Sequence, residues 1–101
     1  MTEKRLRRDE VLQVLQAHRD VLRRLGALSL AVFGSVARDE AQADSDVDIL
    51  VELAPPITFD RYMDVKFYLE DHLQVSVDLV TSTSLNPHIR PQVEREAIYV
   101  S

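Results

Sequence analysis

The sequence predicts a single domain that mixes helices and strands, an α/β (α+β) fold. Two observations carry this prediction. Apolar residues near the N-terminus keep a helical spacing, whereas two later segments alternate apolar and polar residues with the period of a strand. A chain of 101 residues has the size of one domain, and neither a linker nor an internal repeat divides it. We therefore expect one domain over residues 1–101.

The first half of the chain predicts a helix, a strand and a second strand. Helical spacing runs from Asp9 to Leu25, and the following Gly26 is a suitable residue to end a helix. The short apolar run 27–33 is typical of a buried strand, and Ser35 could then cap a short helix over 36–40. In the segment 46–53 the apolar residues alternate with Asp46, Asp48 and Glu52, which predicts a second strand.

The second half repeats this alternation of helix and strand. Pro55-Pro56 ends the previous strand, and Thr58 is a suitable N-cap for a helix that reaches Leu73. A third strand is expected over 74–80, because Val75, Val77 and Leu79 alternate with Ser76 and Asp78. A short helix over 89–95 and a last strand over 97–100 complete the prediction.

Charge is distributed unevenly along the chain. Residues 1–25 hold seven Lys or Arg and four Asp or Glu, whereas residues 26–101 hold five and thirteen. Residues 39–52 include six acids and no base, an arrangement that repels itself unless cations screen or bind it. This acidic segment is either a solvated loop or a cation site. The net negative charge of the larger part makes nucleic acid an unfavourable partner for the basic arm, whose four bases are Lys4, Arg5, Arg7 and Arg8.

Asp46 and Asp48 are candidate metal ligands. Residues two apart on a strand point to the same side, so the two carboxylates would project together. An EF-hand calcium loop beginning at Asp44 would need Gly and Glu where Ile49 and Pro55 stand, which excludes that site. Magnesium fits better, since it is typically held by one or two carboxylates together with water and substrate phosphates.

Gly34 and Ser35 are candidate phosphate ligands. Glycine lets the backbone approach a ligand closely, and the free N–H groups at a helix start suit anionic oxygens. The chain contains only Gly26 and Gly34, so neither a dinucleotide fingerprint nor a Walker loop can be present. Ser35 is not in a nucleophile elbow, because Ala37 stands where the second glycine would be.

Asp78 is a third candidate ligand if its strand pairs beside that of Asp46. Three converging carboxylates could hold two metal ions that assist an in-line displacement at phosphorus. His18, His72 and His88 have no spacing that indicates a shared metal site, and we interpret them as structural. The absence of cysteine, of a signal peptide pattern and of a long apolar run predicts a cytoplasmic protein without a membrane segment.

These motifs resemble those of one known family. The order Gly-Ser-x-Ala-Arg at 34–38, a six-residue spacer, Ser-Asp-x-Asp at 45–48 and a later Asp-Leu-Val at 78–80 is similar to minimal nucleotidyltransferases (MNT) of the DNA polymerase beta superfamily. The resemblance implies a mixed β-sheet with helices packed on one face. It also implies catalytic and metal-binding roles for Asp46, Asp48 and Asp78, and nucleotide contacts for Gly34, Ser35 and Arg38.

The same resemblance implies a reaction and a partner. Members of this family include MNT antitoxins paired with HEPN toxins, so we expect Mg²⁺, two ions, and transfer of AMP from ATP to a hydroxyl acceptor. A tyrosine of a helical HEPN partner is the expected acceptor, with a homo-oligomer as a further possibility. The alternative is an inactive antitoxin that neutralises its partner by binding alone. Asp39 stands where the family usually has glycine, and its charge puts nucleotide affinity in question.

Overall fold

The computed structural model describes residues 7–40 and 46–100, and a four-stranded mixed sheet lies at its centre. The strands are β1 (Ala27–Phe33), β2 (Val47–Leu53), β3 (Val77–Thr81) and β4 (Ile98–Tyr99), in the order β3-β2-β1-β4. β1 runs antiparallel to β2 and to β4, whereas β2 and β3 are parallel. The parallel pair requires a crossover, which α4 (Phe59–Leu73) supplies.

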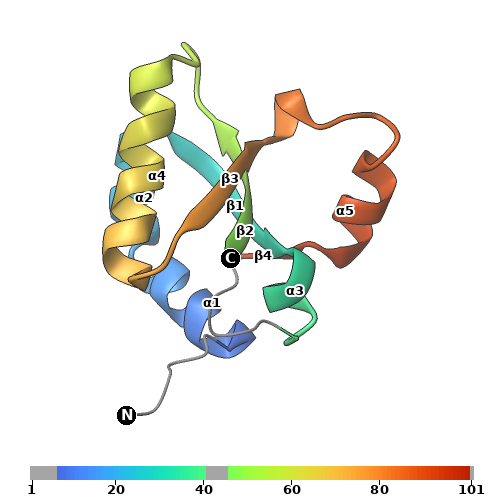
Figure 1. Cartoon of the computed structure of the whole chain (residues 1–101). Helices are drawn as coiled ribbons and strands as arrows, with labels where there is room; N and C mark the ends of the chain where they lie inside the picture. Colours follow the sequence, from blue (N-terminus) through green and yellow to red (C-terminus); the bar gives the residue numbers. More distant parts are fainter. Residues whose placement is uncertain (1–6, 41–45, 101) are drawn as a thin grey trace.

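Three helices cover one face of this sheet. They are α1 (Arg8–Ala17), α2 (Arg19–Leu25) and α4, and they lie together on one side of the strands in Figure 1. The main core forms here, where Val11, Leu15 and Leu69 meet Ile49 and Val51 of β2. The expected mixed sheet is thus confirmed, with α1, α2 and α4 packed on one face. Within the described residues, no helix is both long and apolar enough to cross a membrane.

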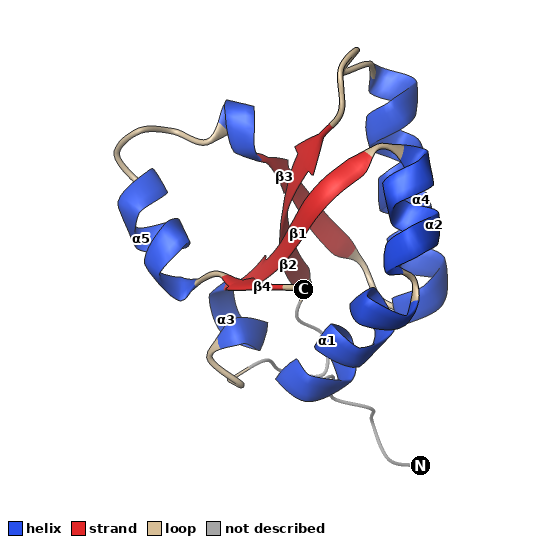
Figure 2. Cartoon of the chain, turned by 180° about the vertical axis from the view of Figure 1, so that it is seen from behind, coloured by secondary structure: helices blue, strands red, loops and turns tan. Residues whose placement is uncertain are grey.

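A smaller apolar cluster lies on the opposite face of the sheet. It joins Ala31 and Leu50 to Leu85 and to Val93 of α5 (Arg90–Glu96), the helix on the far side of the strands in Figure 2. Side chains alternate along a strand, so Asp48 faces the same side as Leu50. The carboxylates therefore lie on the face that only α5 and the short α3 (Gly34–Ala37) border.

Four boundaries show where local prediction succeeds or fails. Thr58 caps α4 as expected, because its Oγ1 accepts a hydrogen bond from the Arg61 N–H at 3.1 Å. The predicted helix 9–25 is divided at His18, where the backbone leaves helical geometry (φ −104°, ψ 12°). Gln74 ends α4 in the left-handed region instead of starting the third strand. Ser35 lies inside α3 and makes no capping hydrogen bond.

Side chains of α4 cover the outer edge of β3. The Glu70 carboxylate accepts a hydrogen bond from the Val77 N–H at 2.9 Å, and the Tyr62 hydroxyl donates to the Leu79 carbonyl at 2.6 Å. β3 is the last strand on its side of the sheet, so these groups would otherwise point to solvent. The crossover helix α4 thus provides hydrogen-bond partners for the edge strand β3.

Candidate active site

Asp48 and Asp78 occupy directly opposite positions on the parallel strands β2 and β3. Opposite residues of neighbouring strands lie about 4.8 Å apart, with their side chains on the same face. The two carboxyl groups therefore interact, and Asp78 raises the pKa of Asp48. Asp46 stands one residue before β2, exposed, and its charge acts on Asp48. Of the three aspartates that we expected to converge, Asp48 and Asp78 are therefore direct neighbours in the sheet, and Asp46 precedes β2.

Asp48 is a weaker acid in the folded chain than an ordinary aspartate. Burial, followed by repulsion from Asp78 and Asp46, raises its pKa from the ordinary 3.8 to about 6, and hydrogen bonding of the protonated Asp48 carboxyl to Asp78 acts in the same direction. Arg38 opposes these effects with a smaller contribution. A divalent cation bound by these carboxylates would relieve the repulsion, so the charge balance of the pair suits a cation.

Gly34 brings the turn after β1 against Asp48. β1 ends at Phe33, which pairs with Asp48 across the sheet, and Gly34 begins α3 in the next position. Its φ is +72°, a conformation that favours glycine. A Cβ added there would contact Asp48 Oδ2 and lie 3.1 Å from Asp48 Cγ. The absence of a side chain at Gly34 therefore lets the half-buried Ser35 and its turn lie beside the carboxylates.

Arg38 connects the turn to α5. Its Nη1 donates to Glu96 Oε1 at 2.9 Å, and its Nε lies 3.4 Å from Glu40 Oε1. The predicted contact of Arg38 with phosphates stays a prediction, since its guanidinium is engaged with two carboxylates here. Glu96 was not foreseen as part of this region, because no local pattern in the sequence relates it to a residue fifty-eight positions earlier.

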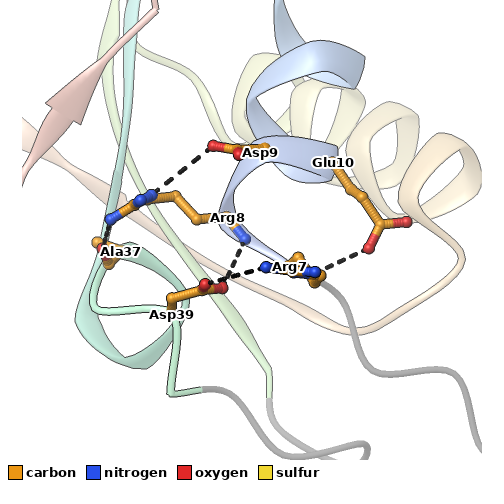
Figure 3. A network of polar contacts seen from close by, with 6 residues as sticks. All are labelled: Arg7, Arg8, Asp9, Glu10, Ala37 and Asp39. Carbon is orange, nitrogen blue, oxygen red and sulfur yellow. Dashed lines mark hydrogen bonds and ion pairs between the residues drawn. The ribbon is translucent and has the colours of Figure 1, made fainter.

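Asp39, which stands where the family usually has glycine, contacts the start of α1 (Figure 3). Its φ is +60°, a left-handed conformation for which glycine is the usual choice. Its carboxylate accepts a hydrogen bond from the Arg8 N–H at 3.2 Å and lies 3.8 Å from Arg7 Nη2. Arg8 also donates to the Ala37 carbonyl at 3.4 Å. Asp39 thus holds the start of α1 through the Arg8 backbone N–H and the Arg7 guanidinium.

The basic arm and the histidines have structural contacts. Arg7 and Arg8 belong to the network of Asp39, while Lys4 and Arg5 lie outside the described residues. His18 Nδ1 lies 2.6 Å from the Tyr68 hydroxyl, and the His18 and His72 rings are 4.2 Å apart. Across residues 7–40 and 46–100, no three His, Cys, Asp or Glu side chains are arranged to hold a metal ion. The donors that fit a cation chemically are the carboxylates of Asp48 and Asp78, with Asp46 beside them.

Comparison with known proteins agrees with this arrangement. The model of the nucleotidyltransferase domain family matches residues 15–100, which is most of the chain. The chain belongs to the nucleotidyltransferase domain family. A relative from Thermococcus cleftensis, the protein adenylyltransferase MntA, is 42% identical over 93 residues, covering 91% of this chain and 94% of that protein. A provisionally named protein adenylyltransferase of Methanocaldococcus jannaschii is 36% identical, covering 90% and 95%.

Solved structures place this nucleotidyltransferase among the minimal members of the family. A structure provisionally described as a minimal nucleotidyltransferase is 44% identical, with a TM-score of 0.73, and the match covers 86% of this chain and 93% of that one. A chain from the complex of tri-AMPylated HEPN toxin with MNT antitoxin of Shewanella oneidensis is 22% identical, with a TM-score of 0.63 over 89% and 71%. The second likeness shows the shared fold. The resemblance expected from the sequence is confirmed.

Proposed function

We propose that this minimal nucleotidyltransferase transfers AMP from ATP to a hydroxyl group of a partner HEPN protein and thereby acts as its antitoxin. The observation that carries the proposal is the in-register pair Asp48 and Asp78 beside the turn at Gly34. The relatives named protein adenylyltransferase support AMP as the transferred group. A structural neighbour holding a tri-AMPylated HEPN toxin supports the choice of partner, and tyrosine is the hydroxyl we assign as acceptor. ATP is plentiful in the cytoplasm, where we place the protein.

The reaction needs a donor phosphate and an acceptor oxygen to meet beside the carboxylates. The acceptor oxygen forms a bond to the α-phosphorus, the bond from that phosphorus to the bridging oxygen breaks, and pyrophosphate leaves. The hydroxyl proton passes to a carboxylate, and exposed Asp78 is the base that we assign. The backbone N–H groups of the turn at Gly34 and Ser35, together with the Ser35 hydroxyl, are suited to bind the triphosphate oxygens.

Magnesium fits the donor set on this face. Asp46, Asp48 and Asp78 would hold it, because hard cations prefer carboxylate oxygens. The raised pKa of Asp48 reflects burial first and then repulsion from Asp78 and Asp46, and a cation offsets that repulsion. When bound, Mg²⁺ supplies positive charge that stabilises the phosphate oxygens. Two ions are proposed on the family resemblance. Arg38 is proposed to hold the turn in place through Glu96, and to contact the phosphates only if that ion pair opens.

Labelling with ATP carrying radioactive phosphorus at the α position tests the proposal. Wild-type protein, Mg²⁺ and a HEPN partner protein should yield a labelled partner, and Asp48→Asn should abolish the label. Glu52→Gln is the matched control, because Glu52 is an exposed acid of the same strand that no site contact involves. Equal labelling by Asp48→Asn and wild type would refute the assigned chemistry.

The rival function is a binding module that neutralises without turnover. It is tested in cells with Asp46→Asn, combined with a measurement of complex stability. Loss of neutralisation with an intact complex supports AMP transfer, whereas full neutralisation by this variant supports binding alone.

A further inference from the structure

An apolar stripe runs along the exposed side of α4. Phe59 is 76% exposed and Phe67 is 58% exposed, although the chain contains only three phenylalanines. Met63 lies between them, and positions four residues apart on a helix are neighbours on its surface. We call Phe59, Met63 and Phe67 the α4 stripe. Two largely exposed aromatic rings along one helix are the kind of feature that marks an interaction surface.

Folding of the domain does not use this stripe. The side of α4 that faces the sheet consists of Val65, Leu69 and Leu73, all buried in the main core. Helical periodicity places Phe67 roughly opposite that side. The α4 stripe therefore points away from the sheet, and its exposure is not a by-product of core packing.

The charges beside the stripe are mainly acidic. Asp60, Asp64 and Asp71 are exposed and follow the same helical row as Phe67. Within the part of the chain that the structure describes, no ion pair joins these three aspartates. On the other side stand Lys66, half-buried, and Glu70, whose carboxylate binds the Val77 N–H. A partner seated on the stripe would thus meet an apolar centre and an acidic border.

A second copy of the chain does not complement this surface. Symmetric packing of two α4 stripes would set Asp60, Asp64 and Asp71 against the same acids of the other copy, which is repulsive. The basic surface of α2, with Arg19, Arg23 and Arg24, borders one exposed large apolar residue, Leu28, which is 45% exposed and lines a pocket together with Arg19 and Arg23. A second copy seated there would set this single leucine against two phenylalanines, so neither self-contact matches both the apolar length of the stripe and its acidic border.

We propose that the α4 stripe docks a helix of a different protein, an amphipathic helix whose apolar ridge is flanked by Lys or Arg. Apolar contact supplies the affinity, and the acidic border selects basic flanks. In identifying this partner with the acceptor protein, the inference rests on the proposed function. The stripe lies on the sheet face opposite Asp48, so the docked helix leaves the carboxylates open to nucleotide.

Two synthetic amphipathic helices of about 18 residues test the docking without nucleotide or partner. Both carry a leucine ridge, flanked by lysine in one and by glutamate in the other. Fluorescence anisotropy with the full chain should show tighter binding of the lysine peptide, weakened by salt. Phe67→Ser should reduce its affinity about tenfold, while Ile89→Ser, which removes a 49% exposed apolar residue near α5, should leave it unchanged.

Several results would overturn the docking proposal. One is stronger binding of the glutamate peptide than of the lysine peptide. A second is a Phe67→Ser variant that binds the lysine peptide as tightly as wild type does, with an unchanged melting temperature. A third is a wild-type dimer, seen in sedimentation, that Phe67→Ser dissociates. Kinetics with the HEPN protein add a second arm, in which Phe67→Ser should raise KM for the protein acceptor and leave KM for ATP unchanged. If wild type transfers no AMP, the proposed function fails, but the peptide result still decides the docking site.

Discussion

At the level of single residues, the pair Asp48 and Asp78 makes stability depend on pH. A carboxyl whose pKa is raised by folding binds its proton more tightly in the folded chain. For Asp48, with a pKa of about 6 instead of 3.8, the free energy of unfolding should therefore fall as the pH rises from about 4 to about 6. Urea unfolding at several pH values without metal measures this fall.

Asp48→Asn is the control for that pH dependence. The variant cannot ionise at position 48, so its stability should exceed that of wild type increasingly as the pH rises through the same window. Addition of Mg²⁺ above pH 6 should stabilise wild type and not the variant, because a cation binds the ionised carboxylates. A parallel pH dependence of the two proteins would contradict this account.

Gly34→Ala should remove most of the transferase activity. The left-handed φ costs an alanine about 1–2 kcal/mol, and the new Cβ displaces the Asp48 carboxylate. Misplacement of a reacting group by about 1 Å can cost a hundredfold in rate, which is the loss we expect in AMP transfer. Steady-state kinetics and urea unfolding measure the two effects separately.

The other glycine supplies the matched control. Gly26 also has a positive φ, +115°, but a Cβ there would meet the side chain of Arg61, away from the carboxylates. Gly26→Ala should lose stability and keep its kcat. If both alanine variants lost activity in proportion to stability, Gly34 would have no special relation to Asp48.

The site could be predicted at this scale only where its residues follow local patterns. Period-two alternation placed Asp48 and Asp78 on polar sides of strands, and the short spacing after Gly34 related the turn to β2. The left-handed backbone of Asp39 and its bond to Arg8 could not be predicted, because they depend on the packing of α1 against the turn. The hydrogen bond between Arg38 and Glu96 could not be predicted for the same reason.

At the level of elements, the link between α4 and β3 is a source of stability. Glu70→Ala leaves the Val77 N–H without its carboxylate partner, and a hydrogen bond to a charged group contributes about 1.5–3 kcal/mol. We expect a loss toward the lower end, since the bond is only partly buried. Asp71→Ala, at the exposed neighbouring position, should change the free energy of unfolding by less than about 0.5 kcal/mol.

The elements themselves could be predicted well, and their ends less so. Each strand and helix that apolar periodicity predicts is present, because burial of the apolar face of an element drives its formation. The division at His18 was not foreseen, since the sequence there has neither proline nor glycine and His18 instead contacts Tyr68 of α4. Gln74 likewise ends α4 through its backbone conformation, which delays β3 to Val77.

At the level of the whole molecule, the core between the sheet and three helices dominates stability. Leu69→Ala should cost about 2–5 kcal/mol, because Leu69 is 1% exposed and a cavity would remain. Phe67→Ala, two residues away on the same helix, should cost less than about 0.5 kcal/mol. Thermal and urea unfolding compare them, and equal losses would mean that Phe67 takes part in the core.

The parallel pairing of β2 with β3 also determines when a site can exist. Asp48 and Asp78 are thirty positions apart, and they become neighbours only after the chain has passed through α4 and returned. Closing such a long segment costs conformational entropy before the pairing compensates for it, which makes this a late, non-local step of folding. A partly folded chain, or one cleaved within α4, therefore holds two separate aspartates and lacks the catalytic centre that we propose. Loss of the crossover would end transfer at once, even where the helices α1 and α2 stay intact.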